Sequence, residues 1–230
     1  MKILGVIGGM GPLATTDFMQ KLIKLTDAEK DSDHIHTIID SCCNTPDRSS
    51  YILGHGEDPT RYIVQSAKRL SSTGADYLVM PCNTAHYFYS AVCSEVDIPF
   101  INMIEETKKY LENQDRVGLL ATEGTYRAGI YEDIFEDIEV IHPSASLRKR
   151  VNTIIYEVKK GIFEREIIEK LVSDILLFYK EYDVDKIILG CSELPIIFNP
   201  YNLDKHFIDT SEILARSAIR YAGKPLKNNI

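Results

Sequence analysis

Two cysteines occupy matching positions at the ends of two apolar segments of the chain. Cys82 lies in VMPCNTAH, residues 79–86, and Cys191 lies in IILGCSELP, residues 187–195. In both segments an apolar run ends, a proline or glycine precedes the cysteine, and small polar residues that can begin a helix follow it. This weak internal repeat predicts that the two thiols stand at equivalent places in two similar lobes.

A thiol between the end of a strand and the start of a helix is suited to acid–base chemistry. The unpaired N–H groups and the positive end of the helix dipole are expected to lower its pKa from about 8.5. If two such thiols face one another across a cleft, one can remove a proton from a carbon atom while the other delivers a proton to the opposite face. The pair therefore indicates inversion of a carbon centre.

The alternative for each cysteine is a buried side chain that only fills space, which is the usual role of a free cysteine. The matched contexts of Cys82 and Cys191 favour the chemical interpretation for this pair. Cys42, Cys43 and Cys93 lack such a context and are interpreted as packing residues.

Short apolar segments that alternate with longer amphipathic segments must position these residues. The predicted strands are 3–7, 36–40, 76–80, 99–103, 116–121, 138–142, 186–190 and 205–209. The predicted helices are 13–25, 59–72, 104–112, 125–134, 147–160, 164–181 and 210–221. Strands separated by helices are typical of an α/β fold with parallel sheets, whose ligands bind at the carboxyl ends of the strands. Residues 41–58, rich in Ser, Asn, Asp, Pro and Gly, are expected to form a long functional loop.

Composition and charge exclude several classes of partner. The 230-residue chain has a net charge of −8 and no run of Lys and Arg longer than three, so we expect neither nucleic acid nor membrane as a partner. Five cysteines without a CxxC pair do not form a disulfide framework, and the first residues are too short an apolar stretch for a signal peptide. We therefore expect a cytoplasmic protein with free thiols. The sequence has no run of 18 apolar residues that could span a membrane.

The cysteine motifs and several other segments resemble one known family, the cofactor-independent aspartate/glutamate racemases, and most of all its aspartate racemase branch. The resemblance extends over essentially the whole chain: GVIGGMGPLAT at 5–15, NTPDR at 44–48, MPCNTAH at 80–86, GLLATEGT at 118–125, IYEVKKG at 155–161 and GCSELP at 190–195. It implies two flavodoxin-like, doubly wound lobes with pseudo-twofold symmetry, an active site in the cleft between them, and a homodimer. It also implies racemisation of a small dicarboxylic amino acid by two cysteines, without pyridoxal phosphate or another cofactor.

The expected domain organisation follows from the repeat and the resemblance. Residues 1–114 and 209–230 form an N-terminal lobe that carries Cys82 and is completed by the C-terminal helix. Residues 115–208 form the second lobe, which carries Cys191. The boundary is expected in the short polar stretch at 113–116.

The resemblance also assigns roles to individual residues. Cys82 and Cys191 are the expected acid/base pair, and Arg48 is expected to hold the side-chain carboxylate of the substrate with its planar guanidinium group. Lys159 is the expected helper of Arg48, with the adjacent Lys160 as the alternative. The other expected substrate contacts supply N–H groups or polar side chains, chiefly for the α-carboxylate: Met10, Gly11, Asn83, Thr84, Thr122, Thr125, Ser192 and Glu193.

Other interpretations of the sequence remain open. GMGPLA at 9–14 fits the G-x-G-x-x-A pattern of nicotinamide-dinucleotide folds, but Asp40 lies beyond the usual offset of about 20 residues for the ribose-binding acid. Without turnover, the same cleft would serve a dicarboxylate-binding protein. Glutamate and broad-specificity racemases are alternatives within the family, because one methylene group changes binding by only about 1–3 kcal/mol. No metal site is predicted, since Cys82 and His86 supply only two ligands.

Overall fold

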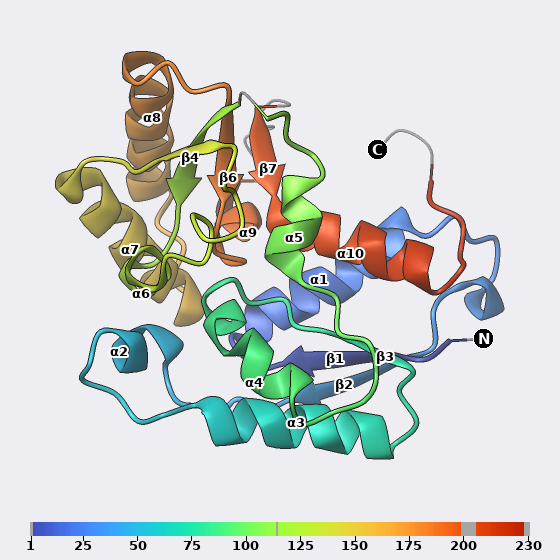
Figure 1. Ribbon diagram of the computed structural model, residues 1–230. Coiled ribbons are helices and arrows are strands. Elements are labelled where there is room, and N and C mark those ends of the chain that lie inside the picture. The colour runs from blue at the N-terminus through green and yellow to red at the C-terminus, as the bar shows by residue number, and fades with distance from the viewer. Residues whose placement is uncertain (1, 114, 199–205, 228–230) are drawn as a thin grey trace.

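Two parallel β-sheets form the centre of the computed structural model, which describes residues 2–113, 115–198 and 206–227 (Figure 1). The first sheet has the strand order β2-β1-β3, and the second has the order β5-β4-β6-β7. The strand pairs that the structure describes in both sheets are parallel. The strands are β1 (Leu4–Gly8), β2 (Thr37–Ser41), β3 (Tyr77–Val79), β4 (Arg116–Leu120), β5 (Glu139–Ile141), β6 (Lys186–Leu189) and β7 (Phe207–Asp209).

The two sheets repeat one topology. In each sheet the first strand lies between the second and the third, and a cysteine follows the third: Cys82 after β3 and Cys191 after β6. A parallel bridge joins Leu78 to Phe100 in the first sheet, as β7 joins β6 in the second. The predicted α/β fold of two doubly wound parallel lobes is therefore confirmed.

The predicted strand at 99–103 is wrong in length, because only this bridge forms. Leu78 donates a hydrogen bond to the Pro99 carbonyl at 2.8 Å, and Ile101 donates to the Leu78 carbonyl at 3.0 Å. Pro99 has no N–H group with which to extend the pairing. The side chain of Asn102 then accepts hydrogen bonds from the N–H groups of the residues that begin the next helix, α5.

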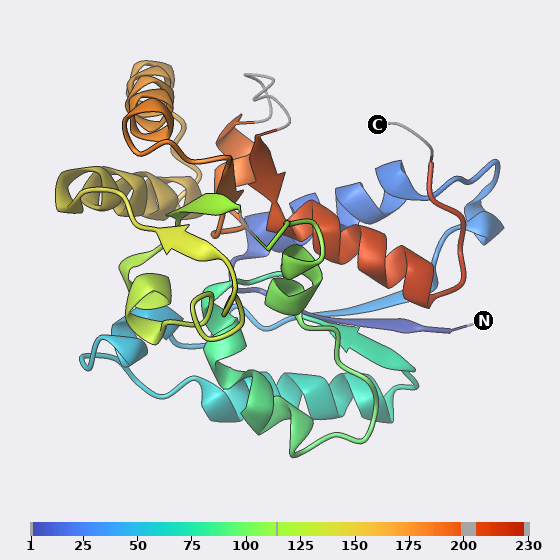
Figure 2. The same ribbon diagram turned by 45° about the horizontal axis from the view of Figure 1, so that its top comes forward.

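Helices cover both faces of the first sheet (Figures 1 and 2). Phe18 of α1 and Leu214 and Ile219 of α10 pack with Leu4 on one face. Helix α3 packs on the other face, where Ile63 meets side chains of β1 and β3. The helices of this half are α1 (Pro12–Leu25), α2 (Arg48–Ile52), α3 (Thr60–Ser72), α4 (Tyr89–Cys93), α5 (Met103–Lys108) and α10 (Thr210–Tyr221), with 3-10 turns η1 (Asp31–Asp33) and η2 (Thr84–Phe88).

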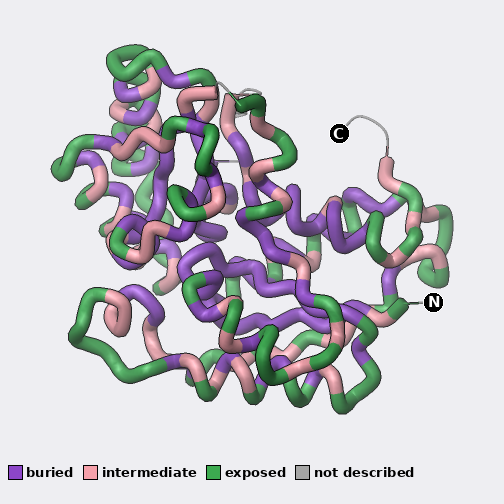
Figure 3. The backbone as a smooth tube through the Cα atoms, viewed as in Figure 1, coloured by how far each residue is buried: buried purple, intermediate pink, exposed green. Residues whose placement is uncertain are grey.

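The second sheet is buried in the same manner, and Figure 3 shows the buried backbone running through both halves. Val151 of α7 and Leu171 of α8 pack against Ile187 on one face, and Tyr131 packs with Val117 on the other. The helices of this half are α6 (Glu123–Ala128), α7 (Ala145–Lys159), α8 (Arg165–Glu181) and α9 (Leu194–Phe198). Among the described residues, no helix is both long enough and apolar enough to cross a bilayer.

The chain passes between the two halves a second time near its end. Strand β7 pairs with β6 in the second sheet, and α10 begins at the next residue, Thr210. Helix α10 packs on α1 and α5, so its apolar side chains lie in the core of the first half. The side chain of Asp209 caps α10 by accepting hydrogen bonds from the N–H groups of Ser211 and Glu212 at 2.9 and 3.1 Å.

Residues 41–58 contain a helix where the sequence analysis expected only a loop. Helix α2 begins after Asp47, whose side chain accepts a hydrogen bond from the N–H group of Ser50 at 2.8 Å. This cap, rather than hydrophobic periodicity, fixes the start of the helix. It places Arg48 and Ser49 on a helical turn instead of an irregular loop.

Candidate active site

Cys82 and Cys191 line the same cavity between the two lobes. Each is buried, and each lies within three residues of the carboxyl end of a strand in its own sheet. The cavity volume is about 10 Å³, which holds about one water molecule. The lining consists of Met10, Asp47, Arg48, Ser49, Cys82, Asn83, Thr84, Thr122, Lys159, Cys191, Ser192 and Glu193.

The turn that carries Cys82 is held by a buried histidine. His86 Nδ1 lies 2.9 Å from the Cys82 carbonyl oxygen, and the Met103 N–H group donates to His86 Nε2 at 3.0 Å. Burial lowers the pKa of His86 to about 4. The imidazole is therefore neutral, with its proton on Nδ1, and it joins the Cys82 turn to the start of α5.

We expect His86 to make stability depend on pH. Below pH 6.5 the unfolded state binds a proton at His86 that the folded state does not bind until about pH 4. The stabilisation is therefore complete above pH 6.5 and is lost as the pH falls towards 4, by about 3 kcal/mol in total. Urea unfolding of wild type and His86→Gln between pH 7.5 and 4 measures this contribution, which the variant lacks.

The exposed His55 supplies the matched control for this measurement. The His55→Gln variant should lose stability with the same pH dependence as the wild type. Parallel curves for wild type and His86→Gln would contradict a neutral, buried His86.

Cys191 donates a hydrogen bond from its thiol group to a neighbouring carboxylate. Its Sγ atom lies 3.0 Å from Glu193 Oε2. Burial and the negative charge of Glu193 raise the pKa of the Cys191 thiol well above its usual range, and Lys159 only partly opposes them. The expected lowering of the pKa is therefore wrong for Cys191, because the thiol is buried and a carboxylate lies beside its sulfur.

Hydrogen bonds tie the two cysteine turns directly to one another. Ser192, which follows Cys191, donates from Oγ to the carbonyl of Pro81, which precedes Cys82, at 3.0 Å. The side chain of Asn83 donates to Thr210 Oγ1 at 3.1 Å and accepts from the Tyr131 hydroxyl at 2.6 Å. These contacts occupy the side chains of Asn83 and Ser192.

A cluster of hydroxyl groups from both lobes forms hydrogen bonds beside the thiols. Thr84 Oγ1 lies 2.8 Å from Thr125 Oγ1 and 3.1 Å from Thr122 Oγ1. Ser49 donates to Thr122 Oγ1 at 3.0 Å. Thr84, Thr122 and Ser49 line the cavity, whereas Thr125 is buried behind them and supports the cluster.

Arg48 is anchored on one side and open on the other. Its Nη1 atom donates to the carbonyl groups of Thr45 and Pro46 at 3.1 and 2.9 Å. Its Nε atom is buried and has no hydrogen-bond partner among the described residues. A buried donor without an acceptor is costly. The open side of the guanidinium group is therefore suited to a carboxylate that enters the cavity.

Lys159, and not Lys160, faces the cavity. Lys159 Nζ lies 4.0 Å from Asp47 Oδ2 and 4.8 Å from the centre of the Tyr156 ring. Burial opposes its charge, but nearby acidic groups, Glu193 foremost, outweigh burial and raise the pKa of the ammonium group. The side chain of Lys160 is 62% exposed and pairs with Glu157 at 2.8 Å.

The glycine-rich turn at 9–11 has a structural explanation within this site. Gly9 has a φ of 83°, and a Cβ atom built on it would lie 2.6 Å from the backbone of Cys42. The adjacent Met10 lines the cavity. Asp40 pairs with Arg69 at 2.6 Å. The close approach of two backbones therefore accounts for the glycine without a dinucleotide.

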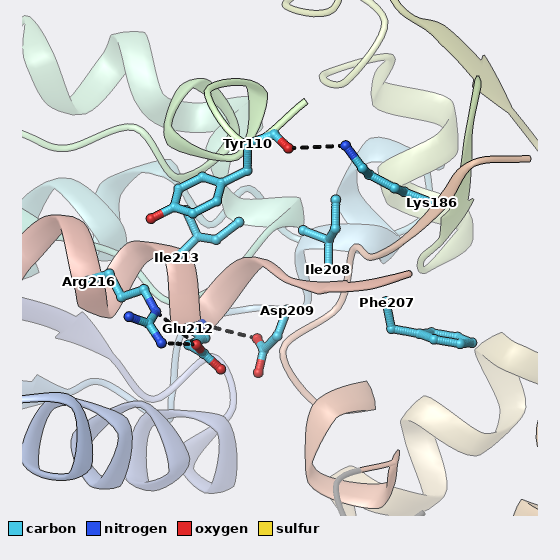
Figure 4. A pocket seen from close by; sticks show the side chains of 8 residues that line it. All are labelled: Tyr110, Lys186, Phe207, Ile208, Asp209, Glu212, Ile213 and Arg216. Atoms are coloured by element: carbon cyan, nitrogen blue, oxygen red, sulfur yellow. Dashed lines mark hydrogen bonds and ion pairs between the residues drawn. The ribbon is translucent and has the colours of Figure 1, made fainter. Parts of the chain in front are cut away.

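A larger hollow lies between the end of α5, strand β7 and the start of α10, and it contains no thiol. Its volume is about 250 Å³. Figure 4 shows Arg216 turned towards Glu212, and Lys186 directed at the carbonyl of Tyr110. The charged groups that line this hollow are paired: Arg216 with Glu212, Asp209 with Lys21 and Lys186 with Asp115.

The sequence and the fold both match known proteins. Residues 7–218 match the family model described as Asp/Glu/Hydantoin racemase. The chain belongs to this racemase family. The broad-specificity amino-acid racemase RacX of Bacillus subtilis is 30% identical over 224 residues, which cover 94% of this chain and 96% of RacX.

Two solved structures extend the match to the complete racemase fold. The aspartate racemase of Picrophilus torridus is 35% identical with a TM-score of 0.85, and the match covers 99% of this chain and 96% of that one. An aspartate racemase homologue from Pyrococcus horikoshii is 26% identical with a TM-score of 0.77, covering 97% and 100% of the two chains. The family resemblance seen in the sequence is thereby confirmed.

Asp47 and Ser49 line the cavity of this racemase-family protein but were not among the expected site residues. Asp47 accepts hydrogen bonds from Ser50 and from the Tyr156 hydroxyl, the latter at 3.1 Å. Although burial opposes it, the hydrogen bonds from Ser50 and the charge of Lys159 hold the pKa of Asp47 below its usual value. The NTPDR motif contained the signal for Asp47, whereas nothing local marks Ser49.

Proposed function

We propose that this chain is an aspartate racemase that inverts Cα through Cys82 and Cys191, without pyridoxal phosphate. The observation that carries the proposal is the meeting of one thiol from each lobe in one buried cavity, next to Arg48 and Lys159. The similarity to the aspartate racemase of Picrophilus torridus supports aspartate as the substrate.

In the proposed reaction, one thiolate removes the α-proton and becomes a thiol. The electron pair of the broken C–H bond passes to Cα and the adjoining carboxylate, and the other thiol gives its proton to the opposite face of Cα. The raised pKa of Cys191 keeps this residue protonated in the resting protein, which suits it to deliver a proton first. Reaction of the other enantiomer runs the same transfers in reverse.

The surroundings of the thiols stabilise the developing negative charge. Backbone N–H groups of Asn83 and Ser192 are the proposed donors to the α-carboxylate, and the tied cysteine turns fix their positions. Arg48 and Lys159 are the proposed partners of the side-chain carboxylate. Because the cavity holds only about one water molecule, the lining must separate to admit aspartate and then exclude solvent around it.

A chirality assay tests the proposal. Purified protein without added cofactor is incubated with each enantiomer of aspartate, glutamate and a panel of other amino acids, and the enantiomers are then separated by chiral chromatography. We expect inversion of both enantiomers of aspartate, faster than that of any other substrate. Binding of aspartate without inversion would instead identify a dicarboxylate-binding protein, and the proposed activity would be wrong.

A broad-specificity racemase is the second candidate, because RacX of Bacillus subtilis is similar over nearly the whole chain. The same panel separates the two candidates. Comparable rates for amino acids with and without a side-chain carboxylate would favour broad specificity. A preference for glutamate over aspartate would instead identify a glutamate racemase.

From the resemblance we further propose a homodimer that works in the cytoplasm. Sedimentation equilibrium of the purified chain tests the assembly, and fractionation of cells tests the location. A monomer at all concentrations would contradict the proposed dimer without affecting the proposed reaction.

Gly124 allows the two lobes to approach, and we expect Gly124→Ala to lower kcat/KM for aspartate by at least about tenfold. A Cβ atom at this position would lie 2.5 Å from both Cα and Oγ of Ser49. Because Cα cannot move alone, α2 and α6 must separate, which moves Arg48 away from the thiols. Steady-state kinetics measure the loss, with circular dichroism as the test of folding.

The neighbouring variant Glu123→Ala is the control, since Glu123 lies on the same helix and faces Arg148 at 3.8 Å. It should change kcat/KM by less than about twofold. Unchanged kinetics in Gly124→Ala would show that the close approach of α2 and α6 does not govern the site.

A further inference from the structure

Glu193 carries a buried carboxylate oxygen that no part of the described protein satisfies. The residue is only 2% exposed, and Oε2 accepts the hydrogen bond from Cys191. Oε1 has no hydrogen-bond partner in the part of the chain that the structure describes. A buried acceptor left without a donor costs free energy, so an unpaired oxygen in a ligand cavity indicates a donor on the ligand.

Oε1 lies beside the turn at residues 9–11. A Cβ atom built on Gly11 would lie 3.2 Å from it, and apart from the neighbours of Gly11 in the chain this Cβ would meet no other described atom within 4 Å. The absence of a side chain at Gly11 therefore leaves room beside Oε1. A small donor group fits between Glu193 and this turn.

The cavity lining carries two cations, Arg48 and Lys159, and two carboxylates, Asp47 and Glu193. Asp47 is already held by Ser50, Tyr156 and Lys159. Arg48 and Lys159 offer positive charge and an unpaired donor, and they suit carboxylates. Glu193 offers negative charge and an unpaired acceptor, and its side chain would repel a carboxylate. The earlier assignment of the Glu193 side chain to the α-carboxylate therefore does not fit its charge, whereas a cation on the ligand does.

We propose that Glu193 binds the α-ammonium group of the substrate through Oε1 and thereby selects amino acids over dicarboxylates that lack nitrogen. The inference rests on the proposed function, whose substrate carries an ammonium group on the carbon that is inverted.

Binding of the ammonium group also makes the Cys191 thiol easier to ionise. The charge of Glu193 is one of the causes that raise the pKa of the Cys191 thiol. A cation beside Oε1 offsets that charge and makes the Cys191 thiolate less costly. The substrate thus supplies part of the electrostatic field in which its own proton is transferred.

Isothermal titration with two ligands tests the inference. Racemic aspartate and succinate differ only in the ammonium group, and a racemic ligand stays unchanged in composition during any turnover. Wild type should bind racemic aspartate at least tenfold more tightly than succinate. In Glu193→Gln the affinity for aspartate should fall at least tenfold while that for succinate changes less than threefold, so the preference disappears.

Gly11→Ala supplies a second variant that leaves every charge in place. Its Cβ atom would crowd Oε1, and we expect the same loss of preference for aspartate. The exposed Glu181 supplies the control, because Glu181→Gln should keep the preference of the wild type. If Glu193→Gln does not fold, Gly11→Ala tests the inference alone: loss of the preference for aspartate supports it, and an unchanged preference contradicts it.

Three outcomes overturn the inference: a wild type that binds succinate as tightly as aspartate, a wild type that binds neither, and a folded Glu193→Gln that keeps the preference. The chirality assay on the same preparations separates this result from the proposed function. Aspartate bound through Glu193 but never inverted would remove the racemase activity and leave the ammonium site. Inversion of aspartate by the wild type, together with an unchanged preference for aspartate over succinate in Glu193→Gln, would support the racemase activity and exclude the ammonium site.

Discussion

Cys82→Ser and Cys191→Ser should each lower the rate of aspartate inversion by about 100- to 10,000-fold, the usual contribution of a positioned acid or base. A hydroxyl group gives up its proton far less readily than a thiol, so serine fills the position without replacing the chemistry. Both cysteines are buried in the cavity, and the smaller oxygen should leave the fold intact. The rate is measured from each enantiomer by chiral chromatography.

Deuterated water adds a second measurement to the cysteine variants. A variant with one remaining base can still exchange the α-hydrogen of one enantiomer without inverting it, and the enantiomer that exchanges identifies the face served by that thiol. The exposed Cys93 is the control, since Cys93→Ser should retain full activity. Full inversion by either Cys82→Ser or Cys191→Ser would exclude that residue from proton transfer.

Arg48→Met should lower kcat/KM for aspartate by about 100-fold, equivalent to about 3 kcal/mol for a charge-assisted contact. The variant removes the donor at Nε that lies buried without a partner, while its straight side chain keeps much of the packing. Any turnover of alanine, which has no side-chain carboxylate, should change far less. Steady-state kinetics with both substrates measure the difference.

Arg61→Met is the matched control, because Arg61 is exposed on α3 and, among the residues that the structure describes, pairs with Glu57 and Tyr62 alone. Its kinetics should equal those of the wild type. An equal loss for aspartate and alanine in Arg48→Met would place Arg48 on the α-carboxylate and contradict its proposed role in substrate selection.

The fold was largely predictable because its signals are local. Apolar runs ending in polar turns identified the strands of both sheets, and the repeated context of Cys82 and Cys191 indicated two similar halves. Strand β7 and helix α10 were also recognisable from their patterns. Helix α2 was missed because a single cap residue, Asp47, sets its start, and it has no hydrophobic period of its own.

Contacts across the lobes limited what the sequence could predict about the site. Ser49 enters the cavity because α2 packs on Gly124, and the two residues are far apart in the chain. Likewise, the engagement of the Ser192 side chain with Pro81 depends on how the two halves dock. Such effects depend on tertiary geometry that no local pattern encodes.

Synthesis from the N-terminus leaves the first half unfinished until α10 emerges from the ribosome. Phe18 and Leu4 are covered by Leu214 and Ile219, which are made almost two hundred residues later. The second half contains its own strands and the helices α7 and α8 that cover one face of its sheet, so it can begin to condense earlier. Nascent chains that end before α10 should therefore present an uncovered apolar surface and aggregate or recruit chaperones. The first half is thus translated first, but its core can close only after the second half has been made.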